Sequence, residues 1–182
     1  MQAIGINFFE RYGCKYLLLM DHFSGLPMYH NKGHRTDTDH TVRRLKMRFA
    51  TFEVRRSIRC NNVPPFFSRG FKGFCEEYCI ELNLTSPHIP EGTGAAERGV
   101  GLIKVIMRKT EKEGSDFEEA LAVFKNTRNK SGYSPNQLFY LRNWRVPNLP
   151  HVQNEPVVEE MVKVMDKIRN GRKVKNDELK KA

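Results

Sequence analysis

The run Tyr16–Met20 (YLLLM) constrains the fold more than any other stretch of this chain. A short continuous apolar run between turns is typical of a strand that is buried on both faces. Apolar runs at Ala3–Phe9 and Leu26–Tyr29 predict two further strands, and the turn Arg11–Cys14 joins the first two as a hairpin. The chain is therefore expected to begin with three strands of one sheet.

Strand and helix patterns alternate after the third strand. Val42, Leu45, Phe49 and Phe52 recur at helical spacing in a helix expected from about Asp39. The later expected elements are a strand at Ser57–Cys60, a helix at Phe67–Tyr78, a strand at Ile80–Leu84, a breaker-rich loop at Ser86–Gly94, a helix at Ala95–Lys112 and a helix capped by Ser115 in a capping box with Glu118. This order predicts an α/β fold in which helices cover both faces of a mixed sheet.

The strongest bulk property is a net charge of +10 with a pI near 9.6. Such an excess favours a polyanionic partner, nucleic acid before an anionic membrane, although a merely soluble basic protein remains open. A hydrophobic fraction of 39% with 12 Phe is sufficient for a packed core. Cys14, Cys60, Cys75 and Cys79 form no CxxC pair and have no His at zinc-finger spacing, so we expect a reducing, intracellular compartment, nuclear or cytoplasmic.

Three positions meet at the carboxyl ends of the expected strands, where open α/β sheets place their ligands. Asn7 lies on the first strand, Asn61 follows the fourth, and Glu97 begins the long helix. Across about residues 4–140 the chain resembles the catalytic core of retroviral and LTR-retrotransposon integrases, most closely the gypsy type. The matching stretches, in that family's order and spacing, are IGINFFERYGCKYLLLMDHFSGLP, SIRCNNVPPFFSRGFKGFCEEYCIELNLTSPHIPEGTGAAERGVGLIK and NTRNKSGYSPNQLFY.

The resemblance implies a ribonuclease H-like fold with a five-stranded mixed sheet. It also implies nucleotidyl transfer with two Mg²⁺ ions held by an Asp, Asp, Glu triad. Carried onto this chain, the triad falls on Asn7, Asn61 and Glu97, and only Glu97 matches. Because Mg²⁺ requires anionic oxygen ligands, we expect lost catalysis, no bound cofactor and only vestigial metal ligation by Glu97.

Two neighbouring features bear on this interpretation. Asp21 follows the second strand, but the family commonly carries an acid there beside the triad, so it is no replacement for a missing aspartate. The family's Asp-Asn-Gly turn is Asn61-Asn62-Val63 here, and Val63 would be strained if that position requires a positive φ.

One stripe of the long helix is a candidate DNA-binding surface. Lys104 matches a family residue that meets DNA ends, and Arg98 and Arg108 are the other expected nucleic-acid-binding residues, although a solvated helix face remains the alternative. The stripe contains Glu97, Gly101, Lys104 and Arg108, and the neighbouring stripe expected to be buried contains Ala96, Val100, Ile103 and Met107.

The sequence therefore predicts a catalytic core-like domain at residues 1–150 and a charged helical linker or tail at 151–182, taken from a longer polyprotein. The expected partners are DNA and a second copy of the chain, with no membrane and no small-molecule substrate. Two alternatives stay open besides a relic without a role. One is a weakly active metal-dependent nuclease or transferase that uses Glu97 and amide ligands, and the other is a dimerising interaction module.

Overall fold

The computed structural model describes residues 3–33, 35, 37–85, 90–142, 144, 162–164, 166–167 and 170. The chain forms two compact units, Met1–Glu113 and Gly114–Ala182. The domain boundary expected at residue 150 stays a prediction. No helix within the described part of the chain is long and apolar enough to cross a bilayer.

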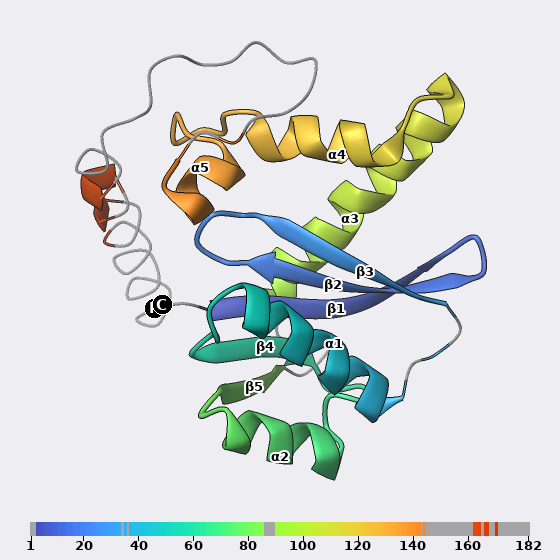
Figure 1. Cartoon of the computed structure of the whole chain (residues 1–182), viewed down its shortest axis with the longest axis vertical. Coiled ribbons are helices and arrows are strands. Elements are labelled where there is room, and N and C mark those ends of the chain that lie inside the picture. The colour runs from blue at the N-terminus through green and yellow to red at the C-terminus, as the bar shows by residue number, and fades with distance from the viewer. Residues whose placement is uncertain are drawn as a thin grey trace. The chain divides into compact units, whose positions relative to one another are not determined.

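The first unit is built on a five-stranded mixed sheet in the order β3-β2-β1-β4-β5 (Figure 1). Its strands are β1 (Ala3–Arg11), β2 (Cys14–Asp21), β3 (Pro27–Gly33), β4 (Ser57–Asn61) and β5 (Glu81–Thr85). β1, β2 and β3 form an antiparallel meander, whereas β4 and β5 add in parallel to β1. The predicted fold class and all five expected strands are confirmed.

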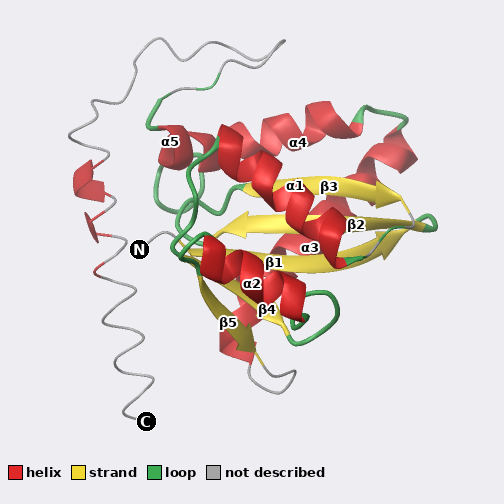
Figure 2. Cartoon of the chain, turned by 60° about the horizontal axis from the view of Figure 1, so that its bottom comes forward, coloured by secondary structure: helices red, strands yellow, loops and turns green. Residues whose placement is uncertain are grey.

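Helices α1 (Thr38–Thr51) and α2 (Arg69–Glu77) cover one face of the sheet, and α3 (Pro90–Glu113) covers the other (Figure 2). Asp37 caps α1 by accepting a hydrogen bond from the His40 amide at 2.8 Å. Helix α3 begins at Pro90, four residues before the expected loop ends, because proline is well tolerated in the first turn of a helix.

Aromatic side chains fill the space between the sheet and the α1 and α2 layer. Phe66 is fully buried and stacks on Phe8 of β1 at a centroid distance of 4.7 Å. Phe71 meets Phe66 edge-on at 5.4 Å, and Phe74 lies 5.9 Å from Phe71. Alternation along β1 therefore places Ile4, Ile6 and Phe8 on this face and leaves Gly5 and Asn7 on the face that α3 covers.

Two glycines allow α3 to lie close against the sheet. A Cβ added to Gly5 would lie 3.0 Å from the Ala96 Cβ, and one added to Gly99 would lie 2.9 Å from Leu18 Cδ2. Three members of the expected buried stripe of α3, Ala96, Ile103 and Met107, are buried, whereas Val100 is half-buried. The glycines thus fix where α3 crosses β1 and β2.

The second unit contains α4 (Phe117–Asn126) and α5 (Pro135–Tyr140). The expected cap at Ser115 is wrong, because Asp116 caps α4 and accepts a hydrogen bond from the Glu119 amide at 2.8 Å. An aspartate also interacts favourably with the helix dipole at this end. Helix α5 was not expected, although Ser134 and Gln137 form a capping box around it.

Two other expectations fall partly or wholly on residues outside the described ones. Residues 86–89 of the expected loop are not described. Of the helix expected after residue 155, residues 162–164, 166–167 and 170 are described and are helical.

Candidate functional site on β1, β4 and α3

Asn7 lies in the middle of β1, and Asn61 ends its parallel neighbour β4. The pairing of β1 with β4 joins Ala3 to Ser57 and ends with Gly5 opposite Arg59. Asn7 and Asn61 each lie two residues beyond that last pair, so both belong to the face on which Gly5 lies. The fold therefore brings the first two predicted triad positions onto one face of two adjacent strands.

Helix α3 supplies the third position. Ala96 packs on Gly5, and the Lys104 ammonium lies 5.9 Å from the centroid of the Phe9 ring. Asn7 lies between Gly5 and Phe9 on the same face of β1, so it faces the part of α3 between these two contacts. Glu97 follows Ala96 directly and is exposed.

The two amides differ from carboxylates in charge and in bonding. Both residues are half-buried. The Oδ1 atom of Asn61 is itself buried and has no hydrogen-bond partner in the described part of the chain. The main-chain oxygen of Asn61 accepts a hydrogen bond from the Val63 amide at 3.0 Å. The strand end thus has a fixed backbone and one unsatisfied side-chain oxygen.

The residues present do not fit a divalent metal centre. Two neutral amides and one exposed carboxylate replace a set of three anionic ligands, and Mg²⁺ depends on such ligands. Burial raises the pKa of the adjacent Cys60 thiol to about 12, so this thiol is protonated at neutral pH. Within the described residues, no three His, Cys, Asp or Glu side chains form a group that could hold a metal ion.

Val63, in the turn after β4, does not have the positive φ that would strain a β-branched residue. The non-glycine residues with positive φ in the described chain are Tyr12, Cys79 and Leu141, so Val63 is not among them. The chain continues from Val63 to Phe66, whose amide donates to the Val63 oxygen at 2.9 Å. A valine is therefore accommodated where the resembling family has glycine.

Asp21 is fully engaged elsewhere, as expected for an acid that does not replace a triad member. Its Oδ1 atom accepts hydrogen bonds from the Ser24 amide at 2.7 Å and from the Ser24 hydroxyl at 2.8 Å. Its Oδ2 atom lies 3.7 Å from Arg55 Nη2, and both side chains are buried. Asp21 also pairs with Ile4 across the strands, on the face opposite to Asn7.

Basic side chains follow Glu97 along α3. Arg98, Lys104 and Arg108 are all exposed. A Cβ added to Gly94 would lie 3.2 Å from Arg98 Nη1, so this guanidinium extends toward the beginning of α3. A Cβ added to Gly101 would meet nothing within 4 Å, which leaves open space in the stripe between Glu97 and Lys104.

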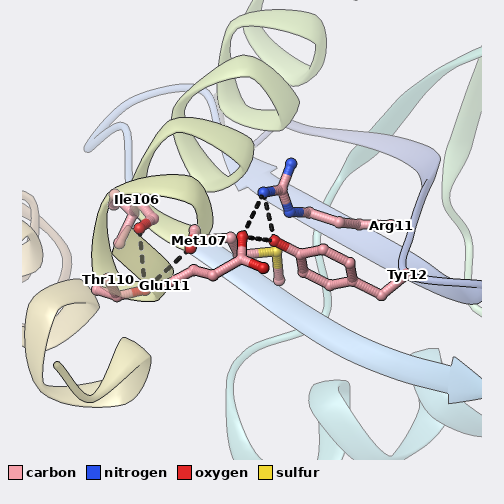
Figure 3. A network of polar contacts seen from close by, with 6 residues as sticks. All are labelled: Arg11, Tyr12, Ile106, Met107, Thr110 and Glu111. Atoms are coloured by element: carbon pink, nitrogen blue, oxygen red, sulfur yellow. Dashed lines mark hydrogen bonds and ion pairs between the residues drawn. The ribbon is translucent and has the colours of Figure 1, made fainter. Parts of the chain in front are cut away.

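The other end of α3 is held to the β1–β2 turn by a polar network (Figure 3). Arg11 Nη2 lies 3.3 Å from Glu111 Oε2, and the Tyr12 hydroxyl donates to the same carboxylate. This contact and the packing of Ala96 on Gly5 fix α3 along β1 at two places. The stripe of α3 is therefore presented on a supported helix.

His22 is a neighbour of this site that sequence reasoning missed. Its Nε2 atom lies 2.9 Å from the position of a Cβ on Gly5, and its amide donates to the Ala3 oxygen at 3.0 Å. A histidine in a turn after a strand carries no periodic signal. Only the register of β1 with β2 shows that it lies beside Gly5.

Comparison with known structures decides the fold. The catalytic core domain of BIV integrase matches with a TM-score of 0.63 at 15% identity, over 77% of this chain and 94% of that one. This chain has the fold of retroviral integrase catalytic cores. An integrase-fold chain from the simian T-cell lymphotropic virus intasome, solved in complex with PP2A regulatory subunit B56 gamma, matches with a TM-score of 0.65 at 20% identity, over 86% of this chain and 59% of that one.

Sequence comparison agrees with this integrase-like fold. The chain is 31% identical over 80 residues to the Gag-Pro-Pol polyprotein of sheep pulmonary adenomatosis virus. That match covers 44% of the chain and spans 5% of the polyprotein. No family model matches the chain.

Proposed function

We propose that the chain is a degenerate integrase catalytic core of LTR-retrotransposon origin, that it binds nucleic acid, and that its strand-transfer chemistry in DNA integration is lost. The observation that carries the proposal is the pair Asn7 and Asn61. Asn7 in the middle of β1 and Asn61 at the end of β4 are the positions onto which the resemblance carries two catalytic aspartates.

The physical reason is the loss of two negative charges. At about 4 Å, one carboxylate attracts a divalent ion by several kcal/mol even at a screened dielectric. An amide oxygen can join a metal shell, but it carries no net charge to replace that attraction. Glu97 alone, exposed on α3, leaves too little charge to hold two ions at ordinary magnesium concentrations.

The test is a nicking and strand-transfer assay on labelled DNA, first with Mg²⁺ and then with Mn²⁺. The native chain is compared with the double variant Asn7→Asp/Asn61→Asp. We expect a silent native chain and measurable activity in the double variant, because the variant restores three carboxylates in the integrase fold.

The control is Glu97→Gln in both backgrounds. It removes the last carboxylate and should abolish the activity of the double variant. Activity of the native chain that disappears with Glu97→Gln would contradict the proposal and support a weakly active nuclease with amide ligands. Silence of both chains would contradict the view that two substitutions alone disarmed the site.

DNA is the proposed partner, and a homodimer is the proposed assembly. The net charge of +10 and the exposed Arg98, Lys104 and Arg108 support a phosphate-directed contact. One chain of similar fold was solved within an intasome. Sedimentation with and without DNA separates the alternatives, because a module that only dimerises should sediment identically in both.

We extend the proposal to the organisation and compartment of the protein. Residues 1–150 form the core-like domain, and 151–182 form a charged linker or tail. The buried free thiols of Cys60 and Cys75 support a reducing compartment, nuclear or cytoplasmic. Limited proteolysis should release a fragment ending near residue 150.

A further inference from the structure

We propose that the surface where α1 meets the edge strand β3 binds a dianionic phosphate through Arg44, Arg48 and His30. This surface belongs to the face of the sheet that α1 and α2 cover, opposite to the face on which Asn7 lies, and the inference does not depend on the proposed function. A free phosphate ion and a phosphate monoester share the charge and the tetrahedral shape that such a site would recognise.

The register of the sheet places His30 on the face that α1 covers. His30 pairs with Leu17, and Leu17 pairs with Phe8, whose ring stacks on Phe66 beneath the helices. Side chains directly opposite each other on neighbouring strands share a face, so the imidazole points to the side of α1. Because β3 is at the edge of the sheet and His30 is half-buried, solvent reaches part of this residue.

Two arginines of α1 extend toward the same strand. Arg44 and Arg48 are four residues apart, so they share one stripe of the helix, and both are half-buried. Arg48 Nη2 donates to the main-chain oxygen of Tyr29, the neighbour of His30, at 3.4 Å, and Arg44 Nε donates to His40 Nε2 at 3.3 Å. Within the described residues neither arginine pairs with a carboxylate. Guanidinium N–H groups that no carboxylate occupies suit a tetrahedral oxyanion.

The pKa values of the neighbouring groups reveal an unbalanced positive charge. Burial, followed by repulsion from Arg48, Arg44 and His40, lowers the pKa of His30 from 6.5 to about 4. Burial also lowers the pKa values of Lys32 and His40, and the charge of Arg44 acts in the same direction on both. The charged groups that act on His30 are thus all basic, and a bound dianion would relieve their repulsion.

Asp37 is the acid that acts on this neighbourhood, and it is engaged elsewhere. Its charge favours the protonated forms of Lys32 and His40. Its carboxylate lies 3.5 Å from Arg35 Nε and accepts a hydrogen bond from the His40 amide at 2.8 Å as the cap of α1. The two arginines nearest to His30 therefore keep two uncompensated charges, which match a dianion better than the single charge of a phosphodiester.

The experiment follows His30 in the full chain by NMR of the histidine Cε1–H signals, with sulfate as the probe. Sulfate is a dianion across the acidic and neutral range, so its own charge does not change during the pH titration. His30→Gln assigns the signal. At constant ionic strength we expect saturating sulfate to raise the pKa of His30 from about 4 to about 5 or above. By linkage, this rise corresponds to sulfate binding about tenfold more tightly to the protonated form than to the neutral form.

A double variant tests whether the two arginines hold the ion. Arg44→Gln/Arg48→Gln should lose the response to sulfate, and without sulfate its His30 should have a higher pKa than in the native chain, because two repelling charges are gone. The matched control is Arg43→Gln/Lys72→Gln, which removes the same charge from exposed positions and should keep the native response. Circular dichroism establishes that each variant is folded, and the native titration requires no variant.

Further titrations identify the source of the phosphate. The probes are inorganic phosphate and a single-stranded oligonucleotide with and without a 5′-phosphate, each added at neutral pH. A shift of the His30 signal with inorganic phosphate but with neither oligonucleotide would identify a free phosphate ion. A shift with the 5′-phosphorylated oligonucleotide but not with its unphosphorylated counterpart would identify a terminal phosphate monoester.

Three results would overturn the inference. An unchanged pKa of His30 in saturating sulfate would show that no dianion binds beside it. Equal responses of the site variant and the control would show that Arg44 and Arg48 do not hold the ion. Equal shifts with the two oligonucleotides would show that the surface contacts phosphodiesters and does not select a dianion.

Discussion

Asp21 ends β2 and Asn61 ends β4, two strands on either side of β1, yet the hydrogen bonding of their side chains differs. Asp21 is 3% exposed, and both of its carboxylate oxygens have partners, from Ser24 and from Arg55. Asn61 keeps a buried oxygen that has no hydrogen-bond partner in the described chain. Within the described residues, the fold thus satisfies the buried charge of Asp21 and leaves the neutral side-chain oxygen of Asn61 without a hydrogen-bond partner.

The largest effect is expected from removing the satisfied carboxylate. Asp21→Ala leaves Arg55 buried without its counter-ion, so the free energy of unfolding should fall by about 3–5 kcal/mol. Urea unfolding followed by circular dichroism measures this. Ser24→Ala is the milder control and should cost about 2 kcal/mol for two lost hydrogen bonds, one to Asp21 and one from the Leu26 amide. A loss below that of Ser24→Ala would mean that the ion pair contributes nothing.

Lys32 gives an intermediate case, a buried charge that the fold satisfies incompletely. The side chain is 4% exposed, and its ammonium donates to the Thr41 hydroxyl at 2.5 Å and lies 4.6 Å from the Phe8 centroid. Burial lowers its pKa from 10.5 to about 8. Lys32→Met keeps the volume and removes the charge, so it should raise the free energy of unfolding at pH 7 by about 2 kcal/mol.

The lowered pKa of Lys32 also predicts how the free energy of unfolding changes with pH. Between pH 8 and 10.5 the unfolded chain holds a proton on Lys32 that the folded chain has lost, so native stability rises with pH across that window. The advantage of Lys32→Met should therefore be full below pH 8 and shrink toward pH 10.5. Urea unfolding of both proteins at pH 7 and pH 10.5 measures the difference. A methionine variant that is less stable at pH 7 would show that the contacts with Thr41 and Phe8 outweigh the desolvation.

Much of the fold could be predicted from the sequence wherever a local pattern specifies it. The apolar runs predicted every strand, because a sheet buried on both faces requires them. The triad positions came from the resemblance to integrase cores, and the fold brings Asn7 and Asn61 onto the same face of adjacent strands. The engagement of Asp21 was consistent with its expected role as no replacement for a missing aspartate.

The remainder depends on tertiary geometry that no local pattern encodes. The backbone conformation of Val63 depends on how the chain returns to bury Phe66. The structure shows that the φ angle of Val63 is not positive. The place of His22 beside Gly5 follows from register, and the open space at Gly101 follows from what surrounds α3. Helix α5 could have been predicted, because Ser134, Pro135 and Gln137 are a local start signal.

The smallest stability effect is expected at the unsatisfied amide. Asn61→Ala removes a half-buried side chain whose buried oxygen has no hydrogen-bond partner in the described chain, so the lost packing and the relieved desolvation should nearly cancel. The free energy of unfolding should change by less than about 0.5 kcal/mol, within the range of ordinary surface substitutions. The same urea titration used for Asp21→Ala measures it, so the two strand ends are compared under one set of conditions. A loss of about 2 kcal/mol or more would show that Asn61 is a structural residue like Asp21, because only a satisfied buried group has that much to lose. A negligible loss of stability together with weaker DNA binding would instead mean that Asp21 stabilises the fold whereas Asn61 contributes to DNA binding.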